Sequence, residues 1–196
     1  ISLSSIDEEK RDKSVDYILQ TAAAAKKMGA KRIVVHSGSC AKISREEALV
    51  LAKDTIKKAV AALDAEGLSD IIICPETMGK INQLGTLSEV MELCLVDERL
   101  LPCIDFGHLN ARTLGGIKTS EDYEKILDEI ENKLGHDRLK HMHCHFSKIE
   151  YTAGGEKRHL TFDDETFGPD FTPLAELLYK KELCPTIICE SSDVMD

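Results

Sequence analysis

The segment DIIICPE at residues 70–76 is a short run of mainly apolar residues, several of them β-branched, that ends in a carboxylate. Four other short segments end in either a histidine or a carboxylate: KRIVVH at 31–36, LLPCID at 100–105, LKHMHCH at 139–145 and PTIICE at 185–190. Short runs of this kind, bounded by turn-forming residues, are typical of strands. Because their apolar residues are nearly continuous rather than alternating, we expect a parallel sheet that is covered on both faces.

Helical segments separate the five predicted strands. Two capping boxes, Ser5 with Glu8 and Ser44 with Glu47, mark the starts of the first two helices, because each pairs an N-cap hydroxyl with a glutamate three residues on. The predicted helices cover residues 6–28, 44–65, 86–96, 121–134 and 173–182. Strands that alternate with helices indicate an α/β fold with right-handed crossovers. The longest irregular stretch, 147–171, is expected to be functional.

The composition is that of one ordinary globular domain. The chain has 196 residues, of which 42% are hydrophobic and 31% charged, and no linker interrupts it, so we predict a single domain over residues 1–196. No apolar run approaches the roughly 20 residues of a membrane span, and the N-terminal residues lack the layout of a signal peptide. We therefore expect a soluble, cytoplasmic protein that does not bind membranes.

The cysteines indicate the redox state of the protein, and the net charge limits the classes of partner that it can bind. The seven cysteines lie mostly within apolar segments, as at Cys74, Cys103, Cys144 and Cys189, so we expect these thiols to be reduced and buried. The formal net charge of −10 argues against sequence-independent binding to nucleic acid, which depends on Lys and Arg. It leaves room for a local basic face, or for metal ions that sit beside a phosphate.

The last residue of each predicted strand is of a type that ligates metals. These residues are, in order, His36, Glu76, Asp105, His145 and Glu190. The carboxyl ends of parallel strands meet on one face in such folds, so the five side chains are expected in one pocket. A single residue of this kind is more often a helix cap or a hydrogen-bonding partner, but converging carboxylates are costly to bury without cations. Mixed imidazole and carboxylate donors favour Zn²⁺, with Mn²⁺ or Fe²⁺ as alternatives.

Two further histidines add to this set. His108 follows Asp105 by three residues, and His159 lies in the long predicted loop. The donors then exceed what one tetrahedral ion needs. A cluster of two or three metals is therefore the sharper hypothesis.

Other His and Cys residues near these positions have simpler interpretations. His141 and His143 start the strand that ends at 145, and we expect them to be partners of nearby polar groups rather than ligands. His136 follows a glycine and is expected in an exposed turn. Cys74 and Cys103 each precede a proposed ligand by two residues, and we expect them to fill space in the core.

Seven motifs follow one another along the chain: ISLSS at 1–5, VVHSGS at 34–39, PETMGKINQLGT at 75–86, CIDFGHLNA at 103–111, HCHFSK at 143–148, KRH at 157–159 and CESS at 189–192. In this order they resemble the endonuclease IV family, which are apurinic/apyrimidinic endonucleases with a TIM-barrel fold and three zinc ions. The resemblance covers nearly the whole chain. It implies a (β/α)8 TIM barrel of which this chain supplies about five βα units.

The resemblance implies a role for each metal-type residue. His36 matches a ligand of one zinc, and Glu76 matches the carboxylate that bridges two zincs. The remaining ligands of the second zinc correspond to Asp105, His145 and Glu190.

The third zinc site departs from the family pattern. His108 and His159 match two of its ligands, but the family has an acid two residues before the second histidine, where this chain has Lys157. The adjacent Glu156 is a candidate replacement for that acid.

A second departure concerns the ends of the chain. In the family, a further zinc-binding histidine and loops that enter the DNA precede the segment like ISLSS, whereas this sequence starts at Ile1. We therefore expect a fragment that lacks early strands and the C-terminal end of the barrel. Its strands at 32–36 and 185–190 are predicted to have unpaired edges, so the isolated fragment should aggregate or be inactive. The complete protein is expected to be a monomer.

The resemblance also implies an activity. It is that of a zinc-dependent endonuclease of DNA repair that hydrolyses the phosphodiester 5′ to abasic sites in double-stranded DNA. Bound metals would generate the attacking hydroxide, with Glu76 as the catalytic group that orients the water. The expected cofactors are two or three zinc ions, with manganese as an alternative.

Two other functions stay open. A sugar isomerase or epimerase of the xylose isomerase-like barrels would need only Glu76, Asp105, His145 and Glu190, since such enzymes use one or two cations. A degenerate barrel that binds metal or nucleic acid without catalysis is the non-enzymatic alternative, favoured by Lys157 and by the acidic net charge.

Overall fold

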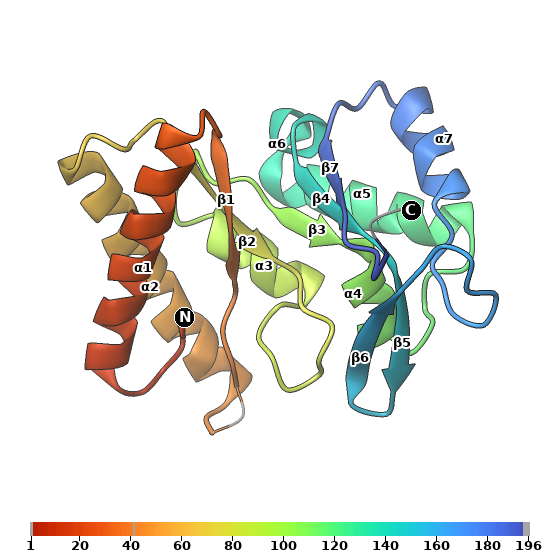
Figure 1. The fold of residues 1–196 in the computed structure, drawn as a ribbon, viewed down its shortest axis with the longest axis horizontal. Helices are drawn as coiled ribbons and strands as arrows, with labels where there is room; N and C mark the ends of the chain where they lie inside the picture. Colours follow the sequence, from red (N-terminus) through yellow and green to blue (C-terminus); the bar gives the residue numbers. More distant parts are fainter. Residues whose placement is uncertain (1, 41, 194–196) are drawn as a thin grey trace. The chain divides into compact units, whose positions relative to one another are not determined.

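The computed structural model describes residues 2–40 and 42–193. The chain divides into two compact units, which we call unit 1 (Ile1–Glu76 and Asn82–Pro102) and unit 2 (Thr77–Ile81 and Cys103–Asp196). Both combine parallel strands with helices, as Figure 1 shows. Among the described residues, no helix is both long and apolar enough to cross a membrane. The expectation of a single domain stays a prediction.

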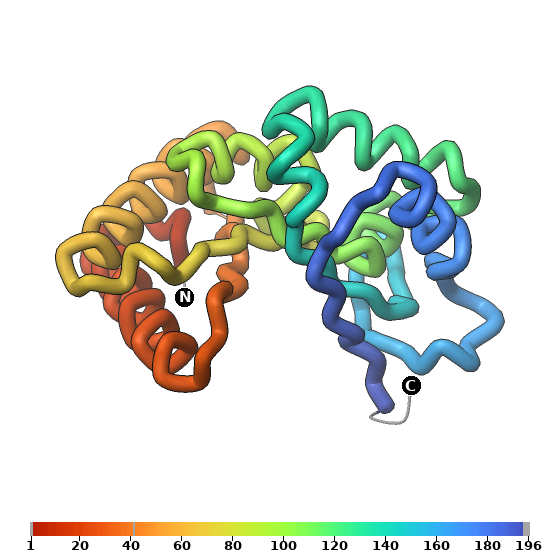
Figure 2. Tube along the Cα trace, turned by 90° about the horizontal axis from the view of Figure 1, so that it is seen from above, coloured from red at the N-terminus to blue at the C-terminus, as the bar shows by residue number. Residues whose placement is uncertain are grey.

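Unit 1 is built on two parallel strands, β1 (Arg32–His36) and β2 (Ile72–Glu76), which pair so that His36 lies opposite Glu76. Its helices are α1 (Glu8–Lys27), α2 (Arg45–Ala65) and α3 (Leu87–Cys94). The helices α1 and α2 lie side by side in both Figure 1 and Figure 2, and α1 also packs on β1. Small buried residues at helical spacing allow this close packing, as at Ala22, Ala48, Ala52 and Ala59.

The predicted starts of the first two helices have different outcomes. The Ser44–Glu47 capping box is confirmed, with the Ser44 hydroxyl accepting from the Glu47 amide at 3.1 Å. The Ser5–Glu8 box is wrong, because Asp7 is the N-cap of α1 and accepts from the Glu9 amide at 3.1 Å. Asp is as good an N-cap as Ser, so the acid that stands directly before the helix takes the role.

A half-buried ion pair joins α2 to the start of α3. Glu89, in the first turn of α3, accepts two hydrogen bonds of 2.7 Å from the Arg45 guanidinium. The same carboxylate accepts from the backbone amides of Gly85 at 2.7 Å and Thr86 at 2.9 Å. Burial raises the pKa of Glu89, but the hydrogen bonds from Arg45, Gly85 and Thr86 outweigh it, so the net shift of the pKa is downward.

Unit 2 contains the parallel strands β3 (Cys103–Asp105), β4 (His143–Phe146) and β7 (Thr186–Cys189), with β4 hydrogen-bonded to both of the others. Its helices are α4 (Phe106–Arg112), α5 (Ser120–Leu134), α6 (His136–Lys140) and α7 (Thr172–Lys180). Buried aromatic rings hold these elements together, since Phe106 lies 5.5 Å from Tyr123 and 6.3 Å from Phe146. The Tyr123 hydroxyl donates to the Asp170 carbonyl at 2.6 Å, which satisfies its polar end.

The strand expected at 139–145 is shorter than predicted. Residues 136–140 form α6, which the sequence did not suggest, and β4 starts only at His143. His136 is the first residue of that helix rather than a turn residue, although it is exposed as expected. His145 is consequently the penultimate residue of its strand, and Glu190 follows directly after β7.

The stretch expected to be an irregular loop at 147–171 begins with a hairpin of β5 (Lys148–Thr152) and β6 (Gly155–Leu160). Its turn contains Gly154, and Gly155 follows with a positive φ of 87°, a conformation that favours glycine. Figure 1 shows the hairpin beside α4, against which β5 packs. His159 therefore lies on a strand, not in a loop.

Residues 77–81 follow β2 in the chain but belong to unit 2, and we call them the 77–81 segment. The Thr77 hydroxyl is hydrogen-bonded to the Asp105 amide at 2.9 Å, and Lys80 bridges to Gly155 in the hairpin. The Arg112 guanidinium donates to the carbonyls of Met78 at 2.7 Å and Lys80 at 2.9 Å. The segment is thus held by β3, α4 and the hairpin.

Of the four cysteines expected to be buried, three are. Cys74, Cys103 and Cys144 are buried, and burial raises the pKa of the Cys74 thiol to about 12.

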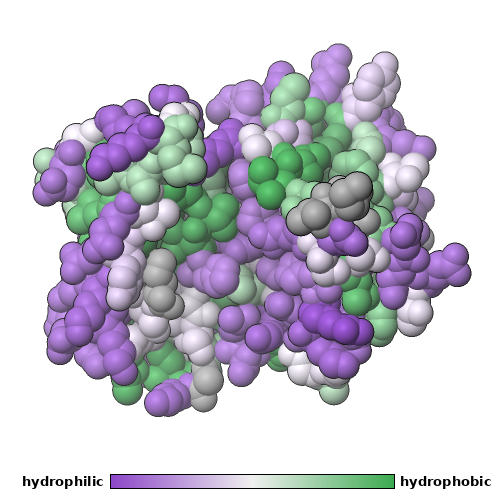
Figure 3. Space-filling view, viewed as in Figure 1, coloured by the Kyte–Doolittle hydropathy of each residue, from purple (hydrophilic) through white to green (hydrophobic). Residues whose placement is uncertain are grey.

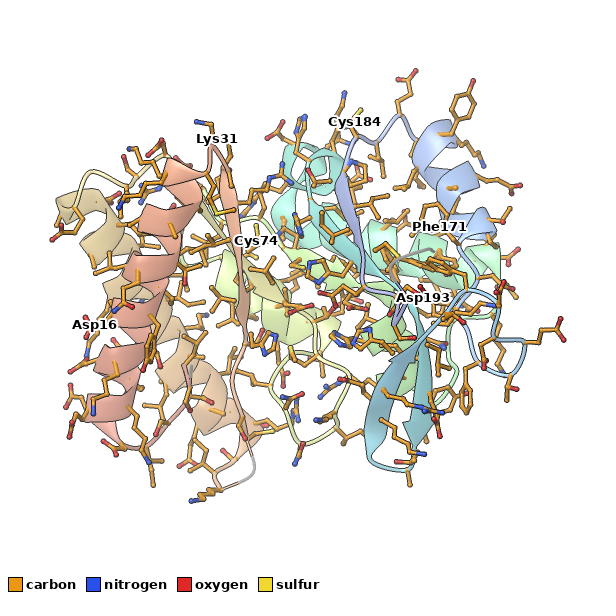
Figure 4. The ribbon with its side chains drawn as sticks, viewed as in Figure 1. Asp16, Lys31, Cys74, Phe171, Cys184 and Asp193 are labelled. Atoms are coloured by element: carbon orange, nitrogen blue, oxygen red, sulfur yellow. The ribbon has the colours of Figure 1, made fainter. Side chains whose placement is uncertain are left out.

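The expectation for Cys189 is wrong, because every residue of β7 is exposed, including Ile188 at 46%. An apolar strand is buried only where other elements cover it, and Figure 3 shows apolar surface where β7 lies in Figure 1. Figure 4 labels Cys74 on β2 and Cys184, which is also exposed, before β7.

We expect Glu89→Gln to lower the free energy of unfolding at pH 7 by about 2 kcal/mol, because it removes the charge from partly buried hydrogen bonds that Arg45 donates. The folded-state pKa of Glu89 lies below the ordinary 4.5, so its contribution is complete above about that pH and is lost as the pH falls through the folded-state value. Urea unfolding at pH 7 and at successively lower pH measures the difference, which should shrink in acid.

Glu92→Gln on the same helix is the matched control. Glu92 pairs with Lys53 at 3.1 Å, with about a third of each side chain exposed, so its loss should cost about 0.5 kcal/mol or less. Equal costs for the two substitutions, or a Glu89→Gln cost that does not change with pH, would contradict the assignment.

Candidate metal centre

The strand ends of unit 1 bring one imidazole and one carboxylate together. His36 and Glu76 are opposite each other in the register of β1 and β2, and His36 Nε2 lies 3.3 Å from Glu76 Oε2. The Glu76 side chain is 3% exposed, whereas that of His36 is 64% exposed. The Ser37 hydroxyl donates to the Glu76 carbonyl at 2.7 Å, which fixes the backbone at the strand end. A carboxylate this deeply buried requires a cation, a proton or hydrogen-bond donors.

The strand ends of unit 2 gather the other three predicted residues. Asp105 and His145 are paired in register on β3 and β4, and His145 Nδ1 lies 3.3 Å from Glu190 Oε1. Asp105, His145 and Glu190 each offer a ligand atom within 4.8 Å of the other two. We call these three residues the strand-end group. Asp105 is fully buried and also caps α4, since its Oδ1 accepts from the His108 amide at 2.7 Å.

A second cluster in unit 2 consists of His108, Glu156 and His159, which we call the hairpin group. Their ligand atoms lie within 4.8 Å of one another. Glu156 lies between the two rings, with Oε2 at 3.4 Å from His108 Nε2 and Oε1 at 4.0 Å from His159 Nε2. The group joins α4 to β6, which are far apart in sequence.

Hydrogen bonds orient both imidazoles of the hairpin group. The Nδ1–H of His108 donates to the Thr77 carbonyl at 2.9 Å, so in the neutral ring Nε2 carries the lone pair. In His159, Nδ1 lies 2.8 Å from the Ser147 hydroxyl, and Nε2 is the nitrogen directed toward Glu156. Metal-binding histidines characteristically use their second nitrogen in this way, which fixes the tautomer and the ring.

A β-bulge decides which acid belongs to the hairpin group. Tyr151 pairs with Glu156 and Glu150 pairs with Arg158, so the register shifts and Lys157 has no opposite residue. Because the extra residue interrupts the alternation of side chains, Glu156 rather than residue 157 shares a face with His159. The Lys157 ammonium bonds instead to Glu150 at 2.6 Å and is 55% exposed. The departure at Lys157 is thus compensated in position by the preceding residue.

The 77–81 segment leaves room for this acid at Gly79. A Cβ atom at that position would lie 2.5 Å from the Glu156 Cβ and 3.0 Å from His108 Cδ2. The Glu156 amide also donates to the Gly79 carbonyl at 3.1 Å. Any side chain at residue 79 would therefore displace the carboxylate from the two rings.

The donor chemistry of both groups fits a transition metal. Around a tetrahedral zinc ion, bonds of about 2.0–2.1 Å separate neighbouring ligand atoms by about 3.4 Å. The separations of 3.3 Å in the strand-end group and 3.4 Å in the hairpin group are of that size. Imidazole with carboxylate suits zinc, and also manganese or iron.

The two remaining histidines near the strand end differ in burial. His141 is the C-cap of α6 and is exposed, with its Nδ1 3.3 Å from an Asp137 carboxylate oxygen. His143 is 7% exposed and lies opposite Cys103 in the register of β3 and β4. Glu156, which the sequence offered as a candidate replacement for the missing acid, is the third member of the hairpin group. The bulge that brings it there leaves no clear signal in one sequence.

Comparisons with known proteins agree with this architecture. Residues 1–194 match the family profile described as "Xylose isomerase-like TIM barrel". The "Uncharacterized protein MJ0133" of Methanocaldococcus jannaschii is 37% identical over 191 residues, which cover 97% of this chain and 68% of that protein. A protein of Staphylococcus carnosus described as "Probable endonuclease 4" is 30% identical over 162 residues, which cover 76% of this chain and 51% of that one.

A similarly described "Probable endonuclease 4" of Mycoplasma pneumoniae is 30% identical over 176 residues, covering 87% of this chain and 58% of its own. The chain therefore spans only between half and two thirds of these two endonuclease 4 relatives.

Two solved structures share the fold. A "D-tagatose 3-epimerase-like protein" has a TM-score of 0.75 at 21% identity, with 100% of this chain and 68% of that chain covered. An "AP endonuclease, family 2" from Brucella melitensis has a TM-score of 0.66 at 14% identity, with 99% and 66% covered. These structures confirm the predicted α/β TIM-barrel fold class, and at such identities they show the fold alone.

We expect Glu156→Gln to weaken zinc binding at the hairpin group by at least about tenfold. The substitution removes the charge of the carboxylate that lies close to the imidazoles of both His108 and His159. Lys157→Gln is the matched control at the neighbouring position and should leave the affinity unchanged. Competition with a chromophoric chelator measures both affinities. A loss with Lys157→Gln as large as that with Glu156→Gln would contradict the bulge-based assignment.

Proposed function

Because the chain belongs to the xylose isomerase-like TIM barrel family, we propose that it is the zinc-dependent endodeoxyribonuclease of this fold that cleaves 5′ to abasic sites in double-stranded DNA. The observation that carries the proposal is the presence of two separate imidazole and carboxylate groups in unit 2, the strand-end group and the hairpin group. The His36–Glu76 pair of unit 1 adds two more donors.

The number of donors favours phosphodiester hydrolysis over sugar chemistry. An isomerase or epimerase acts on one bound sugar with one or two cations, for which the strand-end group and Glu76 would suffice. Hydrolysis of a phosphodiester gains from several ions, since one set can activate water while another stabilises the departing oxygen. The hairpin group would have a role in phosphodiester hydrolysis but none in sugar isomerisation. The names of the endonuclease 4 relatives point the same way.

We propose the following ligands: His36, Glu76, Asp105, His108, His145, Glu156, His159 and Glu190. They would hold two or three zinc ions, with manganese as the alternative. Bound there, the metals supply a hydroxide near neutral pH and a positive charge that offsets the phosphate.

The chain's own residues have separate tasks in this proposal. Glu76 would orient the attacking water and accept its proton, because its carboxylate is buried and held against His36. Asp105 would keep α4, and with it His108, in place through its hydrogen bond to the His108 amide. Metal ions would also let a protein of formal charge −10 hold a DNA phosphate. The proposed setting is DNA repair in the cytoplasm, with the protein as a monomer.

The test is incubation of the protein, at its natural length, with a DNA duplex that contains one tetrahydrofuran abasic analogue. We expect a nick on the 5′ side that leaves a 3′-hydroxyl, no nick in the presence of a chelator, and recovery when zinc is added back. A panel of ketoses is assayed in parallel. Isomerised sugar with intact DNA would replace the proposal by the isomerase, and bound metal with neither reaction would replace it by a binding module.

We expect Glu76→Gln to reduce the rate of abasic-site cleavage at least about 100-fold, because it removes the charge that binds metal and orients water while keeping the shape. Single-turnover cleavage measures the rate, and circular dichroism checks the fold. Glu92→Gln, a partly exposed carboxylate of α3, should cleave at the wild-type rate. Near wild-type activity of Glu76→Gln would rule out the assigned role.

A further inference from the structure

The adjacent strands β3 and β4 carry four chemically active side chains on one face. Cys103 lies opposite His143 in the parallel register, and Asp105 lies opposite His145 two residues further on. Side chains two residues apart on a strand share a face, so these residues form two levels of one surface. Asp105 and His145 belong to the strand-end group at the upper level, and Cys103 and His143 form the lower level.

The lower level and His145 of the upper level together form a compact set of donors. Cys103 Sγ, one nitrogen of His143 and one nitrogen of His145 lie within 4.8 Å of one another. Cys103 is fully buried, and both histidines are 7% exposed. The two imidazole rings are 5.1 Å apart and nearly perpendicular, at 76°. Thr186, opposite His143 on β7, is exposed, so this face is not sealed from solvent.

We propose that Cys103, His143 and His145 bind a thiophilic transition-metal ion, with Zn²⁺ as the natural occupant, at a site one level deeper than the strand-end group. Thiolate and imidazole are the donors that select zinc among the common divalent ions. The fourth tetrahedral position is left to water or to Asp105, which shares the face. The site itself does not depend on the proposed function.

The charge balance favours a cation here. Binding converts the Cys103 thiol to a metal-bound thiolate and releases its proton to solvent. A bare thiolate would be costly to bury, but the ion supplies two positive charges against one negative charge. The imidazoles bind as neutral donors, so nothing else needs to ionise.

The neighbouring strand positions show why Cys103 is more than a small core residue. Cys144, equally buried, lies opposite Ile104 on β3 and Ile187 on β7, which is an apolar setting. Cys103 instead lies opposite an imidazole. The two cysteines therefore provide a matched pair, one beside metal-type donors and one beside aliphatic side chains.

One consequence joins the two levels and rests on the proposed function. His145 belongs both to the strand-end group and to the deeper site. An ion in the deeper site would compete for this imidazole, so excess zinc should inhibit cleavage of abasic DNA through Cys103. If the protein is not a nuclease, this arm of the test is silent in all variants, and the binding measurement decides the site alone.

Titration with Co²⁺, followed by absorbance, tests the site, because a cobalt ion bound by thiolate shows a charge-transfer band in the near ultraviolet that imidazole and carboxylate do not give. We expect the band to develop in the wild type as Co²⁺ is added in excess over the protein, because the strand-end group and the hairpin group would take up Co²⁺ as well. Cys103→Ser should lose most of it, and Cys144→Ser should retain it. His143→Asn should raise the Co²⁺ concentration at half-saturation at least about tenfold.

Circular dichroism and thermal unfolding of each variant check that the fold is kept. Three results would each overturn the proposal: no band in the wild type, an equal band in Cys103→Ser, or loss of the band in Cys144→Ser. In the activity arm, inhibition by excess zinc that is the same in wild type and Cys103→Ser would overturn the competition for His145.

Discussion

The hydrogen bond from His108 Nδ1 to the Thr77 carbonyl is the interaction on which the hairpin group of unit 2 depends. It sets the tautomer of the imidazole, and it anchors the 77–81 segment beside α4. The segment in turn places Gly79, whose lack of a side chain admits the Glu156 carboxylate next to His108. Arg112 strengthens the arrangement by donating to carbonyls of the same segment. This one hydrogen bond thus fixes the orientation of the His108 ring and the position of the 77–81 backbone, and through Gly79 it preserves the space that Glu156 occupies.

The hairpin shows how a local irregularity changes which side chains of residues 156–159 lie together. In a strand without a bulge, residues 157 and 159 would share a face. The Lys157 ammonium would then lie beside the proposed metal ion, and the two positive charges would repel each other. The bulge at Lys157 turns that side chain toward Glu150 and brings Glu156 to the face of His159. The lysine at residue 157 is therefore compatible with the metal proposed at the hairpin group.

The pleat of β3 and β4 organises the rest of the donors. Because successive side chains alternate between faces, Cys103, Asp105, His143 and His145 share one surface, while Ile104 and Cys144 face the opposite side. Acidic and imidazole donors occupy the strand ends, and a thiol with a second imidazole lies one level below. In the proposed sites His145 is shared by the two levels, so ions bound at both would compete for its imidazole.

From the sequence alone one could derive the five parallel strands, most of the helices and the residue types at the strand ends, but not the hairpin of β5 and β6. Short apolar runs that end in His, Asp or Glu have few alternatives in an α/β chain, and a capping box such as Ser44 with Glu47 acts through residues only three apart. The failures also have local causes: Asp7 competed with Ser5 as a cap, and α6 took residues expected in β4.

Which residues meet across long sequence separations could be known only from the folded chain. The close approach of His108 to Glu156 depends on a hairpin, on a bulge and on a glycine 29 residues before His108. None of these three features produces a repeating pattern that could be recognised in a single sequence. The same holds for Cys103, whose sequence context is that of a buried apolar strand. Its neighbour across the sheet is His143 because of strand register, and register is set by the packing of whole elements rather than by adjacent residues.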